Sequence, residues 1–265
     1  MKNQSAINLR LARGICAIFT LLTAPYGYAA DLHVVSSGGF AGAYKELAPE
    51  FEKQTGNKLI TAWGLSNGTS ENAIPMRLER GENIDVVLMT GNSLDELMAR
   101  GKLLPGSKVL LAKSPIACAV KQGESIPDIS TVAKLKDAFL GAKTLAYSNG
   151  ASGEYIKNRL MIHLGIQGQM DGKLKQTLAT PVGEAIASGD AEIGCQQLSE
   201  LKEIKGIEII GLLPQEVQLI TPLFGAVVAK SIAPMQARDL LIFLSSLANA
   251  HVLVANGLTP VTPNN

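Results

Sequence analysis

Short apolar runs alternate with longer segments in which apolar residues recur every three or four positions. The short runs have the length of buried strands, and the longer segments have the period of helices that bury one face. This alternation predicts an α/β fold with a mostly parallel sheet. The predicted strands are 33–36, 58–63, 85–89, 116–120, 144–147, 193–196, 208–212 and 223–228. The predicted helices are 41–55, 70–80, 93–100, 132–140, 153–164, 181–188 and 233–249.

Two long extended segments, 109–114 and 221–228, predict a division into two lobes. A chain that crosses to a second lobe and later returns needs two such connectors. We therefore expect one lobe to contain residues 31–111 and 222–265 and the other to contain residues 112–221. Two lobes joined in this way close by a hinge motion around a ligand in the cleft between them.

The first 30 residues have the pattern of a secretory signal peptide. Lys2, Arg10 and Arg13 precede or begin an apolar segment, and small residues near Ala29 and Ala30 suit cleavage. The apolar segment is shorter than the ~20 residues that a membrane-spanning helix needs. We therefore expect a periplasmic protein with no membrane insertion, cleaved near Ala29 or Ala30.

Net charge and cysteine content restrict the classes of ligand and site that the chain can have. Removing residues 1–30 takes away three positive charges and no negative ones, so the formal net charge falls from +1 to −2. This balance excludes a basic footprint for nucleic acid, and an anion site must be built locally. The mature chain keeps Cys118 and Cys195, which could form a disulfide or remain as two buried thiols. No Cys/His cluster has the spacing of a zinc site, so no metal is expected.

Small and polar residues gather where predicted strands end. The first strand ends in Ser36, Ser37, Gly38 and Gly39, and a helix follows at once. Backbone N–H groups at a helix N-terminus favour an anion, and glycine lets a ligand approach the backbone closely. An ordinary strand-to-helix turn capped by serine is the alternative interpretation.

A similar turn follows the second strand and contains Ser66 and Asn67. Arg77 lies about two turns into the next predicted helix, where it could reach a carboxylate in the cleft or could remain a solvated charge. A third turn contains Tyr147, Ser148, Ser152 and Gly153, and it would lie on the other lobe. Two anion-binding turns that face each other across a hinge would form a clamp.

The fourth segment ends a strand in Gln196 and Gln197, and Glu200 follows. Successive strand residues point to opposite faces, so only one of the two glutamines is expected to face the cleft. Glu200 could equally be a solvated residue of the next helix. No nucleophile–base motif is present, which disfavours a hydrolase and leaves proton transfer by a carboxylate or tyrosine open.

Four stretches carry a resemblance to a known family. They are SSGGFAGAYKELAPEFEKQTG, IPMRLERGENIDVVLM, YSNGASGEYIKNRL and VGEAIASGDAEIGCQQLSEL. In this order behind a signal peptide, the chain resembles the periplasmic molybdate-binding-protein family of ABC transporter solute receptors. The resemblance covers nearly the whole mature chain. It implies a type II periplasmic-binding-protein fold, with two Rossmann-like lobes joined by two hinge crossovers, and it places Ser36, Ser37, Ser66 and the 148–153 loop around the ligand.

The chain departs from the molybdate receptors at several of these positions. It has Ser-Ser-Gly-Gly where those receptors typically carry an Ala-Ala-Ser type of turn. Arg77 and the segment from Gln196 to Glu200 favour a larger anion with several charges. In these respects the chain looks most like the aconitate isomerases, secreted enzymes built on the same receptor fold.

This second resemblance implies a reaction that interconverts trans- and cis-aconitate by an allylic proton shift, without a cofactor. It implies a small polycarboxylate as the ligand, and Glu200, Glu154 and Tyr155 are the expected proton-transfer residues. A transport receptor for an organic anion or a molybdate-like oxyanion is the alternative, and it would have an ABC permease as its partner. In either case we expect a monomer.

Overall fold

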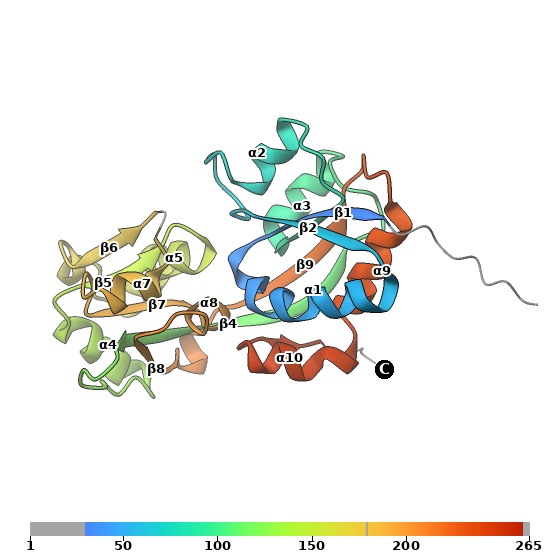
Figure 1. The fold of residues 1–265 in the computed structure, drawn as a ribbon. Helices are drawn as coiled ribbons and strands as arrows, with labels where there is room; N and C mark the ends of the chain where they lie inside the picture. Colours follow the sequence, from blue (N-terminus) through green and yellow to red (C-terminus); the bar gives the residue numbers. More distant parts are fainter. Residues whose placement is uncertain (1–29, 179, 262–265) are drawn as a thin grey trace, which may run out of the picture.

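The computed structural model describes residues 30–178 and 180–261, so the predicted signal peptide up to residue 29 lies outside the described residues. Its ten strands form one twisted sheet with the order β2-β1-β3-β9-β4-β7-β5-β6, and β8 and β10 also pair with β4 (Figure 1). The strands are β1 (Asp31–Ser36), β2 (Lys58–Trp63), β3 (Val86–Thr90), β4 (Val109–Lys121), β5 (Leu145–Ser148), β6 (Leu174–Thr177), β7 (Ile193–Gln197), β8 (Ile207–Leu212), β9 (Ile220–Val227) and β10 (Thr259–Pro260).

Helices cover the sheet on both faces (Figure 1). They are α1 (Ala41–Thr55), α2 (Ile74–Glu79), α3 (Gly91–Ala99), α4 (Val132–Gly141), α5 (Ala151–Tyr155), α6 (Met161–His163), α7 (Val182–Ala187), α8 (Leu198–Leu201), α9 (Pro234–Leu244) and α10 (Ala250–Ala255). A π-helical turn at Ile156–Leu160 joins α5 to α6, and a 3-10 turn, η1 (Gly38–Phe40), precedes α1. The sequence did not predict α8, α10, β6 or β10 as separate elements, because each is only two to six residues long.

The sheet is parallel in two blocks and antiparallel between them. β1 pairs in parallel with β2 and β3, and β5 pairs in parallel with β6 and β7. β4 and β9 run antiparallel to each other, β9 is antiparallel to β3, and β4 is antiparallel to β7. The expectation of a mostly parallel sheet therefore holds only inside each block, because one connecting strand leaves the first block and the other returns to it.

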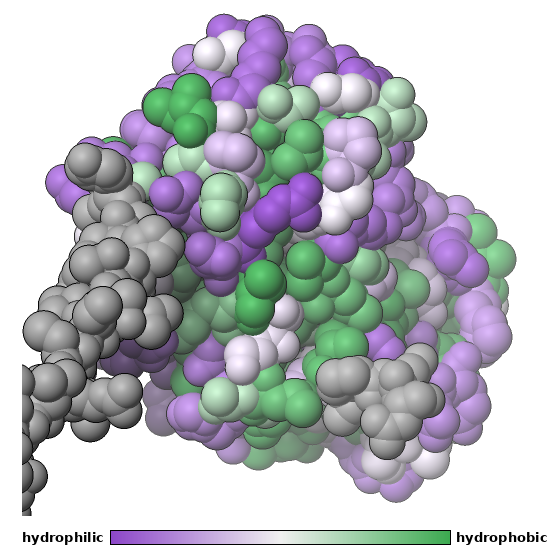
Figure 2. Space-filling model, turned by 90° about the vertical axis from the view of Figure 1, so that its right-hand side faces the viewer, coloured by the Kyte–Doolittle hydropathy of each residue, from purple (hydrophilic) through white to green (hydrophobic). Residues whose placement is uncertain are grey.

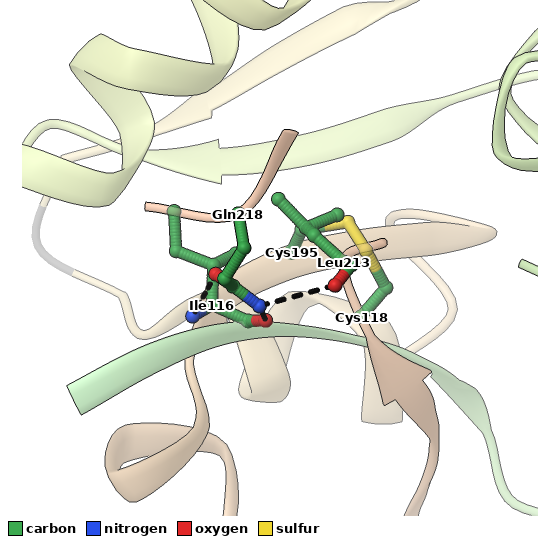
Figure 3. Close-up of a disulfide and its surroundings, with 5 residues drawn as sticks. All are labelled: Ile116, Cys118, Cys195, Leu213 and Gln218. Carbon is green, nitrogen blue, oxygen red and sulfur yellow. Dashed lines mark hydrogen bonds between the residues drawn. A yellow bond between two sulfur atoms is a disulfide. The ribbon is translucent and has the colours of Figure 1, made fainter. Parts of the chain in front are cut away.

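β4 is one continuous strand of 13 residues, although the sequence suggested an extended segment followed by a separate strand. Its residues up to Pro115 pair with β9, and its residues from Ile116 onward pair with β7. At this change of partner the Gln218 side chain accepts a hydrogen bond from the Ile116 N–H (2.8 Å) and donates one to the Ile116 carbonyl (2.9 Å) (Figure 3). The Gln218 carboxamide thus satisfies the N–H and the carbonyl of Ile116 at the point where β4 changes its partner strand.

Buried apolar side chains form clusters that follow the two blocks. Two clusters use residues between 32 and 112 and between 223 and 258, and the other two use residues between 116 and 217. We call these sets the first half and the second half. They resemble the two predicted lobes in extent, but the lobe boundaries themselves stay a prediction.

A disulfide joins Cys118 of β4 to Cys195 of β7, which resolves the two alternatives that the sequence left open (Figure 3). The two residues are direct partners in the antiparallel register, with their Cα atoms 4.0 Å apart, and both are fully buried. The bond therefore fixes β7 against β4 just before β7 reaches Gln196 and Gln197.

Polar and apolar patches alternate on the molecular face that bears α9 (Figure 2). Exposed apolar residues near α9 include Ile232, Met235 and Ile242. Within the described residues, no single helix has both the length and the hydropathy to cross a membrane. The bent pair Pro234–Leu244 and Leu247–Ala255 meets that test only when its two members are taken together.

Candidate functional site

A cavity of about 170 Å³ lies between the two halves, at the carboxyl ends of β1, β3, β5, β6 and β7. Ligands of open α/β sheets bind at this edge. Uncharged polar groups and glycines make up most of the lining, which consists of Ser37, Gly38, Gly39, Leu65, Ser66, Asn67, Thr90, Ser148, Asn149, Gly150, Ala151, Ser152, Thr177, Leu178, Thr180, Pro181, Gln196, Gln197 and Glu200.

The first half contributes the turn after β1. Ser37 lies between β1 and η1, and its buried hydroxyl oxygen has no hydrogen-bond partner among the described residues. Buried polar atoms are normally paired, so an unpaired hydroxyl at a cavity wall is suited to a ligand. A Cβ atom at Gly39 would lie 2.5 Å from Oε1 of Gln197, so a larger residue here would displace the end of the Gln197 side chain.

The loop after β2 reaches the same wall. The Ser66 hydroxyl accepts a hydrogen bond from the Thr90 N–H at 3.1 Å, which leaves the hydroxyl proton free to donate. This bond ties the loop to the end of β3, and both residues line the cavity together with Asn67. The first half therefore offers several donors without a positive charge.

The second half contributes the turn between β5 and α5. Ser148 Oγ accepts from the Gly150 N–H at 3.3 Å and lies 3.4 Å from Ser152 Oγ. Gly153 lets the backbone of α5 approach this turn closely, since a Cβ atom there would lie only 1.7 Å from the Ser148 carbonyl oxygen. This third turn and the first turn line the same cavity, and their action as a clamp on an anion stays a prediction.

Gln196, Gln197 and Glu200 also line the cavity. Strand alternation predicted that only one glutamine would face it, yet both line it. Gln197 is the last residue of β7 and the N-cap of α8, so the alternation of the strand ends with it. Gln197 Oε1 is buried and unpaired among the described residues, whereas Gln196 Nε2 donates to Glu200 Oε2.

The pKa of Glu200 is raised to about 7, chiefly by burial and also by the nearby Glu203 carboxylate, while the hydrogen bond from Gln196 opposes the rise. The Glu200 carboxyl also lies against Gly38, because a Cβ atom on Gly38 would be 3.4 Å from Glu200 Cδ. A carboxyl with a pKa near neutrality can both accept and return a proton.

Six of the residues predicted for the site lie outside the cavity lining. Ser36 and Tyr147 are buried behind it, and Gly153 supports the turn. Glu154 is exposed on α5, and the Tyr155 hydroxyl donates to the Val217 carbonyl at 2.7 Å. Arg77 Nη1 pairs with Glu82 at 2.8 Å.

The cavity also contains residues that the sequence interpretation did not select, among them Thr90, Thr177 and Thr180. Thr90 ends β3, so the rule about strand ends would have found it. Thr177 ends β6, whose short and polar sequence gave no strand signal. Lys, Arg and His are absent from the lining as the structure describes it, and residues 30–178 and 180–261 contain no group of three or more metal-ligating side chains.

Comparison with known proteins places these features in a family. Residues 32–259 match the bacterial extracellular solute-binding proteins. The chain is 44% identical to an aconitate isomerase from Pseudomonas sp over 230 residues, covering 87% of this chain and 88% of that protein. It is 25% identical over 199 residues to the molybdate-binding protein ModA of Azotobacter vinelandii, covering 74% of this chain and 75% of ModA.

Solved structures give the same fold. The Azotobacter vinelandii periplasmic molybdate-binding protein superposes with a TM-score of 0.71 at 20% identity, over 88% of this chain and all of that one. The sulfate-binding protein SubI of Mycobacterium tuberculosis superposes with a TM-score of 0.67 at 16% identity, over 88% of each chain. The predicted periplasmic-binding-protein fold is confirmed, and the chain belongs to the family of bacterial extracellular solute-binding proteins.

Proposed function

We propose that this protein is an aconitate isomerase, which interconverts trans- and cis-aconitate in the cavity between its two halves. The observation that carries the proposal is Glu200, a carboxyl with a pKa near 7 in a cavity lined by neutral hydrogen-bond donors. The extensive identity to a named aconitate isomerase supports the same reaction.

The reaction needs one proton to move between two carbon atoms. The Glu200 carboxylate takes a proton from the methylene carbon of aconitate, and the electron pair spreads over the allyl system and the adjacent carboxylates. The Glu200 carboxyl then returns a proton to the other end of the allyl system, so that the double bond has shifted. Atoms and charges balance without a cofactor.

The neutral donors have a defined part in this step. Negative charge grows on the substrate carboxylate next to the carbanion, and donors fixed in advance stabilise such charge. The hydroxyls of Ser37 and Ser66 from the first half and of Ser148 and Ser152 from the second half could supply this stabilisation. Asn67, Gln197 and the Gly38–Gly39 backbone complete the proposed ligand set.

Glu154, Tyr155 and Arg77 have no role in this proposal. Glu154 faces solvent, and the hydroxyl of Tyr155 and the guanidinium of Arg77 already have partners within the protein. Ser36, Tyr147 and Gly153 act behind the lining, where they hold the two turns in place.

The test is to incubate the purified mature protein with trans-aconitate in deuterated water and to follow the products by NMR. We expect cis-aconitate with altered isotope content, and Glu200→Gln should reduce kcat by about 10²-fold or more. A wild-type protein that binds trans-aconitate tightly without converting it would instead be a receptor. Stabilisation against heat by molybdate, and by neither aconitate isomer, would contradict both functions for an organic anion.

A transport receptor for an organic anion is the second candidate, favoured by the family and by the similarity to ModA. In that case an ABC permease would be its partner. For either function we propose export to the periplasm, cleavage near Ala29 or Ala30, and action as a monomer.

A further inference from the structure

Gln196 joins the proposed proton-transfer residue to the start of a helix. Its side chain is buried, with 4% exposed. Gln196 Oε1 accepts a hydrogen bond from the Val182 N–H at 3.2 Å, and Gln196 Nε2 donates to Glu200 Oε2. One carboxamide therefore serves two partners, and the direction of each hydrogen bond follows from what those partners need.

Val182 fixes the orientation of this carboxamide. It is the first residue of α7 and is fully buried, so its N–H has no carbonyl of the preceding turn to bond. The residue before it is Pro181, whose side chain has no acceptor, and no side-chain cap is formed there. A buried N–H needs an acceptor, so the oxygen of Gln196 must face Val182 and the NH2 group must face Glu200.

We infer that Gln196 is a positioning residue that holds Glu200 Oε2 and leaves Oε1 as the oxygen that gives and takes the proton. An N–H donor occupies Oε2, so a proton on the carboxyl resides on Oε1. A Cβ atom at Gly38 would lie 3.5 Å from the same oxygen, Oε2, so glycine leaves room for the carboxyl at this place. This inference rests on the proposed function for its chemical meaning, while the hydrogen bond can be tested without any turnover.

Other charged groups near Glu200 have partners elsewhere in the protein. Glu203, one turn further along the chain, forms an ion pair with Lys45 of α1. Lys202 Nζ donates to the Ala255 carbonyl at 2.8 Å. Among the described residues, Gln196 is the one whose side chain is hydrogen-bonded to the Glu200 carboxyl. Changes at Gln196 should therefore act on Glu200 directly.

Two variants separate positioning from packing. Gln196→Glu keeps an acceptor for the Val182 N–H and replaces the donor to Glu200 by a second carboxylate. Gln196→Met removes both the acceptor and the donor at a similar volume. Gln197→Met is the matched control, since it alters the neighbouring carboxamide without touching this hydrogen bond.

The measurement is NMR titration of protein labelled at the glutamate side-chain carboxyl carbons, with Glu200→Gln used to assign the signal. We expect Gln196→Glu to raise the pKa of Glu200 by about 1 or more, because two close carboxyls hold a proton to higher pH. Gln196→Met should raise the pKa of Glu200 by a smaller amount. Gln197→Met should leave this pKa within about 0.3 of the wild-type value, which is much less than the shift that loss of one charge interaction causes.

The wild-type protein offers a further measurement if a variant does not fold. The side-chain NH2 signals of Gln196 should shift with pH at the same midpoint as the Glu200 carbon. The inference would be overturned if the Gln196 signals did not shift at this midpoint. It would also be overturned if Glu200 had the wild-type pKa in both Gln196 variants. A confirmed hydrogen bond in a protein that leaves trans-aconitate unchanged would retain the positioning role and reject the proposed function.

Discussion

Glu200 owes its properties to its neighbours. The same side chain in solvent would be a permanent carboxylate, but burial and the nearby Glu203 raise its pKa to about 7. The sequence could name Glu200, Glu154 and Tyr155 as candidates because each follows a strand-end turn. It could not rank them, since the ranking depends on which side chains reach the cavity and which already have partners.

The raised pKa predicts a pH-dependent stability that Glu200→Gln should remove. The folded carboxyl binds a proton more tightly than the unfolded one, whose pKa is 4.5, so its contribution to the free energy of unfolding is complete below that pH. The contribution is lost as the pH rises through about 7. At about pH 8, Glu200→Gln should therefore unfold with a free energy about 1–3 kcal/mol higher than the wild type.

Urea denaturation at a series of pH values checks this. The exposed Glu154→Gln is the control and should follow the wild-type curve. A Glu200→Gln protein with the same pH dependence as the wild type would show that the Glu200 carboxyl titrates like a solvated one.

Among the elements, the turns between strands and helices were the most predictable part of the site. Serine and glycine at a strand end leave a clear pattern, and two of these turns line the same cavity. Arg77 shows the limit of the pattern. Its position on a helix suggested a reach toward the ligand, but Glu82 lies close enough in the chain to bind the guanidinium first. β6 was not predictable because LKQT has neither apolar alternation nor a β-branched run.

Gly153→Ala should disturb the turn of the second half. The added Cβ atom would lie 1.7 Å from the Ser148 carbonyl oxygen. Because this oxygen belongs to the backbone, it cannot move without moving the turn. We expect a loss of about 1–3 kcal/mol in the free energy of unfolding and weaker binding of trans-aconitate. Thermal unfolding with and without trans-aconitate measures both effects.

Gly150→Ala is the matched change in the same turn. Its Cβ atom would lie 3.6 Å from Ser148 Oγ, an ordinary contact, so the expected loss of stability is below about 1 kcal/mol. Equal losses in the two variants would contradict the supporting role given to Gly153.

On the scale of the whole molecule, the cavity joins two separately packed halves and has no cationic side chain in its described lining. The sequence predicted the α/β class and the likeness to binding proteins, because the alternation of elements and the family motifs are local. It predicted 109–114 and 221–228 as the connecting segments, but it did not predict that β4 continues to Lys121 or that β4 and β9 pair with each other, since that depends on pairing between distant segments.

Binding of an anion with three charges should therefore be accompanied by uptake of a proton from solution at Glu200. Without a cation nearby, the substrate should raise the pKa of Glu200 further, so that most complexes at about pH 7.5 contain protonated Glu200 and the remaining carboxylate form starts the proton transfer. With a pKa of about 7, about a quarter of free Glu200 is already protonated at about pH 7.5, so binding of the saturated analogue propane-1,2,3-tricarboxylate should take up between about 0.5 and 0.75 proton per molecule. Calorimetry in two buffers of different ionisation enthalpy measures this uptake, and Glu200→Gln should abolish it. Equal binding enthalpies in the two buffers would mean that Glu200 stays charged beside the ligand.

The bond between Cys118 and Cys195 has a consequence for how the protein is made. It closes a loop between positions 77 residues apart, and loss of such a cross-link costs about 4.5 kcal/mol by the chain-entropy relation. Thiols stay reduced in the bacterial cytoplasm and oxidise after export. A recombinant preparation that never leaves the cytoplasm would hold β7, with Gln196 and Gln197, by hydrogen bonds and packing alone. Activity and stability measured on such a preparation would describe a weaker molecule than the one that the exporting cell produces.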